Sequence, residues 1–353
     1  MRLEDTQTEQ DKQIAANHPG AQAVTSWLLW KKCLDAWVEK KNYLWALLIL
    51  PVGLMVPLVL NGYWVFLMTL ALVYAVATTG FTFILGWAGL LAFCNSAFFG
   101  LGAYAGGAAA SKLGMPAEIA IVGGGLAGAI LGLAFGLVAV RLRRYYLAIT
   151  AISFMFILDY LFRHLETVTG GVRGLPIPAP QFFLLGYLKV SSMHGQYYVS
   201  FLLLGLVYCF AVMLRKSRLG REWQVVRADE RVAKALGINI YVSRLKAFAI
   251  GFAVISASGA WLGFLLGTIY PQSFSGNEMM FHFLIVAIGG LGSVNGAVGG
   301  AILLVVLRQY LRGYLGISEI LFGLLLFFTV LALQKGIYGT LAAKFKGLRE
   351  GFV

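Results

Sequence analysis

Three ionisable side chains lie inside or beside otherwise apolar stretches of the sequence. Asp159 lies in the apolar segment 145–163, and Glu278 and His282 are one helical turn apart at the start of a short apolar segment. An ionisable group deep in a membrane marks a functional site by default, whereas one near a segment end reaches the interface or pairs locally. We favour the second interpretation for all three, which means either that they reach the outer interface or that Glu278 pairs locally with His282, and we retain Asp159 as a candidate for a translocation path.

Motifs for nucleotide, metal or covalent chemistry do not occur in the sequence. The string nearest to a phosphate-binding loop, Gly107–Lys112, lacks the second glycine and lies in an apolar segment. No HExxH or GxSxG string occurs, and the 4 His and 3 Cys residues form no CxxC or Cys/His cluster. We therefore predict that the chain is not an enzyme and has no catalytic residue, metal site or cofactor of its own.

The elements that carry these side chains must be membrane helices. Apolar residues make up 59% of the sequence and charged residues only 12%, against roughly 25% charged residues in a soluble globular protein. The mean hydropathy is +0.80. Such a chain needs the bilayer as its solvent, which predicts an all-α, polytopic helical bundle.

Ten apolar segments follow one another along the chain. They are 43–60, 64–85, 88–110, 117–140, 145–163, 197–214, 247–269, 278–293, 294–312 and 316–333. A helix of about 20 residues spans the hydrocarbon core, and segments 88–110 and 278–293 are Gly-rich or short, so we expect some of the elements to be broken or re-entrant. We predict about ten spans, or eight if 278–293 and 294–312 form a hairpin that does not cross.

Positive charge orients these spans. The net charge of +13 comes from Lys and Arg clustered beside the apolar segments, which is typical of cytoplasmic loops and excludes nucleic acid as the partner. We expect a cytoplasmic tail over 1–42, a permease domain over 43–334 and a cytoplasmic C-terminal tail over 335–353. Within the domain, 164–196 is predicted to be periplasmic and 215–246 cytoplasmic.

The N-terminal tail has a pattern of its own. Trp27, Trp30, Leu34 and Trp37 recur at steps of three and four among charged residues. This spacing indicates a short amphipathic helix in the membrane interface, with an ordinary packing helix as the alternative.

Glycines recur every four residues on three segments, which places them on one helix face. Small residues at this spacing let two helices approach closely in lipid, so we interpret them as helix-packing positions, with an interface to a partner subunit as the alternative. The first two sets are Gly124, Gly128, Gly132 and Gly136, and Gly259, Gly263 and Gly267.

The basic loop 215–246 carries more pattern than a topological signal needs. Its apolar residues form a partial helix face, and Gly237 stands where a left-handed helix cap is expected. A short helix that ends in a glycine turn is suited to docking a soluble partner, and a solvated loop is the alternative.

The same loop carries a family resemblance. The stretch Leu219–Ile240 resembles the coupling loop of ATP-binding-cassette importer permeases, and more narrowly the branched-chain amino-acid permease family of the LivM type. The matching positions are Glu230, Ala233, Ala235, Leu236, Gly237 and Ile238. Further stretches that resemble the family are Leu85–Tyr104, Arg141–Thr150, Glu166–Gly174, Ser273–Glu278 and Gly289–Gly300.

The resemblance implies a transport mechanism and its partners. A second, related permease subunit would form a heterodimer with this chain, two ATP-binding subunits would hold ATP and Mg²⁺, and a periplasmic binding protein would deliver solute. The chain would be a multi-pass protein of the bacterial inner membrane with both termini in the cytoplasm. Its residues Glu230, Ala233, Ala235, Leu236 and Gly237 would couple it to the ATP-binding subunits.

Departures from the family pattern concern the solute. Family members often read FGHA where this chain has Phe93, Cys94, Asn95 and Ser96, and they often carry Glu and Arg near Asp159. We take Cys94, Asn95, Ser96 and Asp159 as candidates for the translocation path. Branched-chain or other hydrophobic amino acids are the expected solutes. Urea, amides or aromatic acids are the alternative solutes, and a stand-alone secondary carrier is the alternative mechanism.

Overall fold

The computed structural model describes residues 53–142, 144–182, 188–190, 192–311, 321, 323–325 and 327. The chain divides into two units, Met1–Met55 and Val56–Val353, and only the second is described in any length. The predicted N-terminal tail with its interfacial helix, the C-terminal tail, and most of the predicted segments 43–60 and 316–333 lie outside the described residues.

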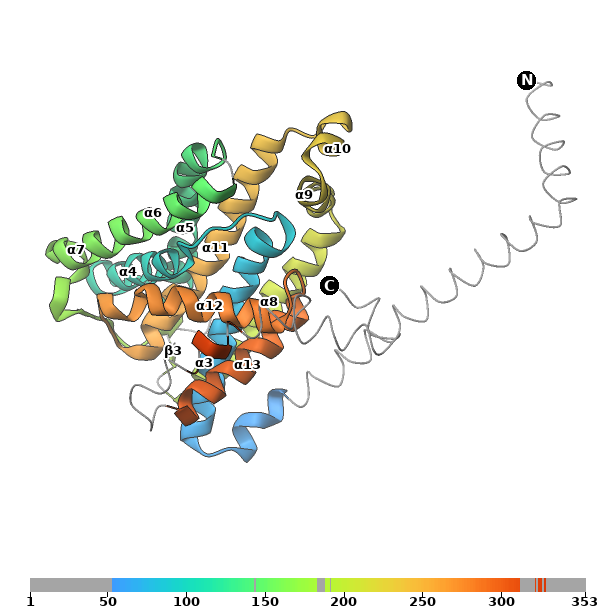
Figure 1. Ribbon diagram of the computed structural model, residues 1–353. Coiled ribbons are helices and arrows are strands. Elements are labelled where there is room, and N and C mark those ends of the chain that lie inside the picture. Colours follow the sequence, from blue (N-terminus) through green and yellow to red (C-terminus); the bar gives the residue numbers. More distant parts are fainter. Residues whose placement is uncertain are drawn as a thin grey trace, which may run out of the picture. The chain divides into compact units, whose positions relative to one another are not determined.

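Long helices dominate the second unit, with short strands at one end (Figure 1). The helices are α3 (Gly62–Phe81), continued by the π-helix η1 (Thr82–Trp87), α4 (Asn95–Leu113), α5 (Ala117–Ala139), α6 (Arg144–His164), α7 (Glu166–Thr169), the 3₁₀ turn η2 (Gly171–Arg173), α8 (Met193–Lys216), α9 (Arg218–Ala228), α10 (Glu230–Ala235), α11 (Ile240–Leu266), the 3₁₀ turn η3 (Pro271–Phe274), α12 (Gly276–Gly289) and α13 (Val294–Leu311). The strands β1 (Leu175–Pro176) and β4 (Thr268–Ile269) pair antiparallel, as do β2 (Gln181–Phe182) and β3 (Leu188–Lys189).

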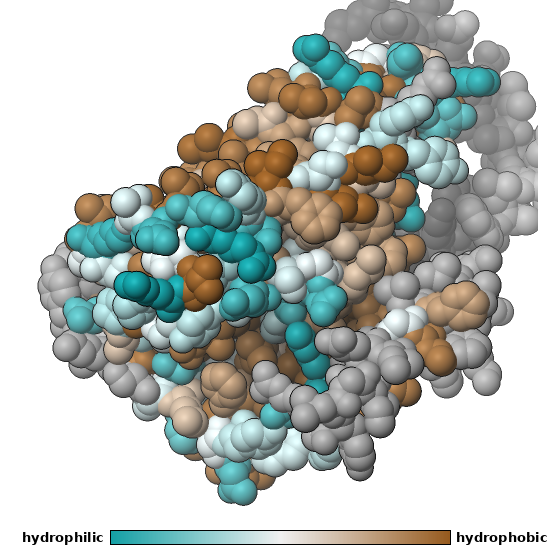
Figure 2. All heavy atoms as spheres, turned by 60° about the vertical axis from the view of Figure 1, so that its left-hand side comes forward, coloured by the Kyte–Doolittle hydropathy of each residue, from teal (hydrophilic) through white to brown (hydrophobic). Residues whose placement is uncertain are grey.

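Six helices of the described chain are long and apolar enough to cross a membrane. They are Gly62–Trp87, Ala117–Ala139, Tyr145–His164, Met193–Lys216, Ile240–Leu266 and Val294–Leu311. On one face of the molecule, apolar side chains form a broad band between two groups of hydrophilic ones (Figure 2). The helical membrane architecture agrees with the sequence, whereas the count of about ten spans stays a prediction.

The weak predicted segment 88–110 is broken at its start. Helix α3 widens into the π-helix η1, the chain is irregular after Trp87, and α4 begins only at Asn95. Irregular backbone at membrane depth is tolerated where it is buried in protein, and most residues from Trp87 to Asn95 are buried or partly buried.

Helix α11 is the central element, and α4 packs directly on its backbone. A methyl group in place of the Gly259 hydrogen would lie 1.9 Å from the Phe99 carbonyl oxygen, and one at Gly102 would lie 1.8 Å from the Ser256 carbonyl oxygen. Side chains longer than hydrogen cannot fit at either position, so glycine sets the distance between these two helices.

The four glycines predicted on α5 all face α11. A methyl group at Gly124 would come within 2.8 Å of Ala260, and one at Gly128 within 2.2 Å of Ser256. A methyl group at Gly132 would come within 2.9 Å of Phe252, and one at Gly136 within 2.9 Å of Leu245. The partners step backwards along α11 as the glycines step forwards along α5, so the two helices run antiparallel.

Gly267 differs from the packing role that its spacing predicts. It lies just after the last turn of α11 with φ +69°, and a methyl group there would meet nothing within 4 Å. The residue ends the helix in a left-handed cap. By contrast, a methyl group at Gly263 would come within 2.8 Å of Ile177, so that glycine does lie at a packed position.

Helices α12 and α13 form a tight hairpin. A methyl group at Gly289 would lie 2.1 Å from the Gly296 carbonyl oxygen, and one at Gly300 would lie 2.6 Å from the Ile285 carbonyl oxygen. The tip turns through Gly290 and Gly292, which have φ values of +123° and +101°. The hairpin therefore leaves from and returns to the same end of the bundle.

Contacts between segments define two ends of the bundle. At the end that we call the α7 end, Lys112 in the last turn of α4 donates to the Thr167 carbonyl of α7, and Gln309 of α13 donates to Tyr63 of α3. At the opposite end, the α9 end, η1 and the hairpin tip meet α9. At each of these ends, therefore, segments that are far apart in sequence contact one another.

Glycine substitutions test this packing. We expect Gly259→Ala to lower the free energy of unfolding in detergent by about 2–3 kcal/mol, because the new methyl group meets backbone and cannot be accommodated by a rotamer change. Gly123→Ala on α5 is the matched control, since a methyl group there meets nothing within 4 Å. Equal thermal stability of the two variants would contradict the close α4–α11 contact.

Candidate functional site

Helix α9 packs through one face against the long helices α8 and α11. Trp223 is fully buried and its indole nitrogen donates to the Ser243 carbonyl of α11 at 2.9 Å. Ser217 caps the helix at Gly220, where a methyl group would lie 2.4 Å from the Leu214 carbonyl oxygen of α8. The indole hydrogen bond and the glycine contact hold α9 against the two long helices that flank it in sequence.

Helix α10 follows after a single residue and is capped at both ends. The Asp229 carboxylate accepts a hydrogen bond from the Arg231 backbone at 2.7 Å, which satisfies a free N–H of the first turn. At the other end Gly237 has φ +75°, the left-handed conformation that the sequence predicts, and the Ile238 N–H donates to the Ala233 carbonyl at 3.0 Å. A helix of only 6 residues depends on such caps and on its packing.

The predicted coupling residues divide between an anchored face and a free face. Ala233 is fully buried, and Glu230 forms an ion pair with Arg244 at the start of α11. Ala235, Leu236 and Gly237 are exposed, and Leu236 keeps 66% of its surface exposed. Together with Val232, which is also exposed, Leu236 gives α10 an apolar surface that is held in a fixed orientation.

The path candidates Asn95 and Ser96 lie in the first turn of α4. Both residues are fully buried, and neither the Asn95 side-chain amide nor the Ser96 hydroxyl has a hydrogen-bond partner among the described residues. Cys94 precedes them, is also fully buried, and provides no side-chain cap for the helix. Unpaired polar groups inside a protein are rare and costly, so these residues are suited to meeting a polar solute.

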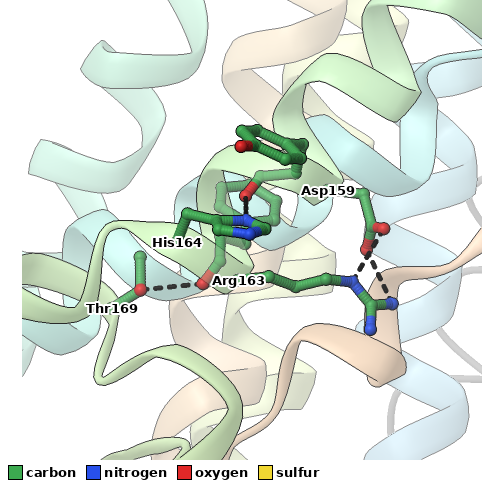
Figure 3. Close-up of polar contacts among 6 residues, drawn as sticks. Asp159, Arg163, His164 and Thr169 are labelled. Carbon is green, nitrogen blue, oxygen red and sulfur yellow. Dashed lines mark hydrogen bonds and ion pairs between the residues drawn. The ribbon is translucent and has the colours of Figure 1, made fainter.

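Asp159 lies in the last turns of α6 and is paired locally. The Arg163 guanidinium donates to both of its carboxylate oxygens, at 2.9 and 3.2 Å (Figure 3). In the same region the His164 ring nitrogen lies 2.9 Å from the Tyr160 carbonyl oxygen, and the Thr169 hydroxyl donates to the Phe162 carbonyl at 2.8 Å. Among the described residues, no hydrogen bond joins the Asp159 carboxylate to Asn95 or Ser96, whose side chains have no partner.

The predicted pair of Glu278 with His282 is wrong. Glu278 accepts hydrogen bonds from Nη1 of Arg308 at 3.0 and 3.3 Å and from the Tyr74 hydroxyl. The hairpin brings Arg308 near the end of α13 beside the first turn of α12, and a guanidinium is a stronger partner for a carboxylate than an imidazole. His282 lies instead between the rings of Tyr74 and Phe99, with centroids 5.3 and 5.1 Å away.

Two of these partners were missed from the sequence for different reasons. Arg163 follows Asp159 by four residues, and this spacing alone places the two side chains on one helix face. Arg308 lies 30 residues after Glu278, and only the hairpin geometry shows that the two meet. Arg308 also lies over the Phe281 ring at 4.5 Å from its centroid, so it ties α13 to α12 by two contacts.

Known proteins resemble this chain over most of its length. Residues 63–333 match the family described as branched-chain amino acid transport system permease components. The high-affinity branched-chain amino acid transport system permease protein LivM of Escherichia coli is 29% identical over 321 residues, covering 85% of this chain and 75% of LivM. The high-affinity branched-chain amino acid transport system permease protein LivH of Salmonella typhimurium is 26% identical over 289 residues, covering 77% of this chain and 92% of LivH. No solved structure matches the chain.

The ion pair between Glu278 and Arg308 gives a stability prediction. We expect Arg308→Ala to lower the free energy of unfolding in detergent by about 3 kcal/mol, because it leaves the Glu278 carboxylate buried without its cation. The matched control is Arg163→Ala, whose partner Asp159 is more exposed, at 25% against 6% for the Glu278 side chain. That change should cost about 0.5 kcal/mol. Thermal unfolding of both variants in the same detergent measures the difference, and equal losses would contradict it.

Proposed function

The chain belongs to the family of branched-chain amino acid transport permease components, and from that premise we propose how it moves solute and with which partners. As a member of this family it is a membrane-embedded permease subunit of an ATP-binding-cassette importer for amino acids. The proposal concerns the finer points, which are the coupling surface, the subunits around it, the orientation and the path.

The free face of α10 is the observation that carries the proposal. A short helix with an exposed apolar side chain normally has little reason to be rigid, yet α10 is capped at both ends, anchored through Ala233 and linked to α11 by the Glu230–Arg244 ion pair. A partner that binds Leu236 and Val232 therefore moves α9 and α10 as a unit, without bending a flexible loop. We infer that an ATP-binding subunit docks on this face.

ATP-driven closure of two such subunits would supply the movement. ATP and Mg²⁺ would be bound by those partners, in keeping with the lack of a phosphate-binding loop in the sequence. Displacement of α9 and α10 would then be passed to the long helices that contact them, α8 and α11, and would switch the bundle between two arrangements by small rigid-body shifts.

A second permease subunit would complete the path. The two subunits LivM and LivH of the relatives both resemble this chain, which supports a heterodimer of two homologous permeases. Helices α5, α6 and α8 carry exposed apolar side chains, including Ile130, Phe156 and Leu206, and these surfaces would face lipid or the second permease. A periplasmic binding protein would deliver the solute, with a branched-chain amino acid as the first expectation.

The proposed orientation is supported by the charge at one of the two ends of the bundle. The α9 end holds the basic stretch 215–246, whose Lys and Arg residues favour the cytoplasm. We therefore place the α9 end on the cytoplasmic side of a bacterial inner membrane and the α7 end, with its short strands, on the periplasmic side. Both termini would lie in the cytoplasm.

The buried polar residues of α4 support a place for the solute inside the bundle. The N-terminus of a helix carries a partial positive charge and free N–H groups, which attract the carboxylate of an amino acid. Asn95 and Ser96 add an amide and a hydroxyl to that end of α4, both without a partner among the described residues. We propose that Asn95 and Ser96 contact the solute in transit.

The coupling proposal predicts the effect of a charge on α10. Leu236→Asp should leave the protein folded in the membrane, because the side chain is exposed, but should weaken binding of the ATP-binding subunits by about 2 kcal/mol, roughly 30-fold. ATP-dependent uptake should fall with it. Co-purification from detergent measures the binding. Val172→Asp, with a side chain 61% exposed at the α7 end, is the control and should co-purify normally.

Two outcomes would contradict the coupling proposal. One is normal co-purification and uptake with Leu236→Asp. The other is gradient-driven flux of amino acid through the permease reconstituted without any ATP-binding subunit, which would favour a stand-alone carrier.

The path proposal predicts that stability and transport move in opposite directions. Asn95→Leu removes a buried amide that has no partner among the described residues, so the free energy of unfolding should stay equal or rise by about 1 kcal/mol. Uptake at low solute concentration should fall about tenfold, because a polar contact to the solute is lost. Ser153→Ala on α6, whose exposed hydroxyl donates to the Ile149 carbonyl, should change neither. Unchanged uptake with Asn95→Leu would rule out the contact.

A further inference from the structure

One side chain of α9 points away from the proposed docking face and into the bundle. Arg227, in the last turn of α9, donates through Nη1 to the Gly86 carbonyl of η1. The contact joins residues 141 positions apart in sequence. The other two arginines of α9 do not reach the bundle in this way, since Arg218 pairs with Glu222 and Arg221 donates to the Lys216 carbonyl.

The Gly86 carbonyl lies where a membrane helix stops. Helix α3 ends in the π-helix Thr82–Trp87, and the last carbonyls of a helix lack intrahelical partners and carry partial negative charge. A guanidinium from another element satisfies one of them. The chain then turns at Gly89, which has φ +70°, and a methyl group there would lie 2.9 Å from the Arg227 side chain. The first break in the bundle is thus built around Arg227.

The second break, the tip of the α12–α13 hairpin, meets the same side chain. A methyl group at Gly292 would lie 3.4 Å from Nη1 of Arg227, and one at Gly86 would lie 2.7 Å from the Gly292 Cα. Trp87 closes the junction, because its indole nitrogen donates to the Gly292 carbonyl at 3.0 Å. The end of α3, the hairpin tip and α9 therefore meet within one layer of contacts.

Broken helices are the points at which a membrane bundle changes its arrangement with least cost, because their backbone is not fixed by a continuous hydrogen-bond ladder. We propose that Arg227 is the positioning residue that transmits the movement of α9 and α10 to the end of α3 and to the α12–α13 hairpin. The proposal rests on the coupling function of α9 and α10, and it adds a specific route from the docked subunit to the interior.

Uptake per ATP hydrolysed tests this route in the complete transporter. The assembled complex of both permeases, the ATP-binding subunits and the binding protein is placed in proteoliposomes, and uptake of leucine and ATP hydrolysis are measured on the same vesicles. Arg227→Gln should leave assembly and hydrolysis in place and lower leucine uptake per ATP about tenfold or more, because a charged hydrogen bond is lost. Arg227→Lys should recover part of the ratio, and Arg218→Gln should match the unchanged complex.

A conformational readout separates transmission from a general structural role. In a background of Cys33→Ser and Cys209→Ser, spin labels are placed at Leu303→Cys on α13 and Ile130→Cys on α5, both exposed. The distance between the labels should change between the ADP-bound and vanadate-trapped complexes. With Arg227→Gln that change should disappear while hydrolysis continues.

The outcomes distinguish the proposed role of Arg227 from the coupling function of α9 and α10, on which that role rests. An unaltered ratio of uptake to hydrolysis in Arg227→Gln, or a label distance that still responds to nucleotide, overturns the role of Arg227. Loss of co-purification in Arg227→Gln also overturns it, because the residue would then act in docking. Failure of the unsubstituted complex to couple uptake to ATP would instead overturn the coupling function itself.

Discussion

The close approach of α11 to α4 and α5 is the constraint on which the rest of the bundle depends. In lipid there is little hydrophobic gain from bringing two apolar helices together, so association depends on dispersion contacts over a large, well-fitted area. Gly102 and Gly259 let the backbones of α4 and α11 touch, and Gly128 does the same for α5. Because α11 begins just after α10 and ends at the short strands, a shift of this three-helix core changes contacts at both ends of the bundle.

Several amide and charged side chains of the bundle lie where helices stop or start. Asn95 and Ser96 lie at the beginning of α4, Arg227 reaches the end of η1, and Glu278 lies in the first turn of α12. Helix ends have free backbone groups that can meet charge, whereas the middle of a continuous helix has none. These four side chains therefore lie close to the free backbone groups of helix ends.

Sequence alone was informative where the signal was local. Four-residue spacing identified the glycines of α5 that face α11, and Gly237 was placed in a left-handed cap because both features depend only on helix geometry. The late start of α4 at Asn95 could not be foreseen, since it depends on contacts of η1 with the distant hairpin tip. For the same reason, the sequence shows Arg227 only as one basic residue among several in the loop 215–246. It does not reveal the partner of Arg308, because the Glu278 carboxylate lies 30 residues away across the hairpin turn. Gly267 shows the reverse error, a regular spacing that continues one step past the end of its helix.

The ion pair that joins the first turn of α12 to the last turns of α13 has a consequence for biogenesis. Helix α12 has only 14 residues, about 21 Å of length, and carries Glu278 and His282, so it is a poor membrane segment by itself. A charged residue within an apolar segment raises the free-energy cost of inserting that segment. Arg308 brings the opposite charge, together with a longer apolar helix, only after the turn has been synthesised. Insertion of α12 and α13 together, as one hairpin with compensating charges, avoids placing the Glu278 carboxylate in the bilayer without its cation.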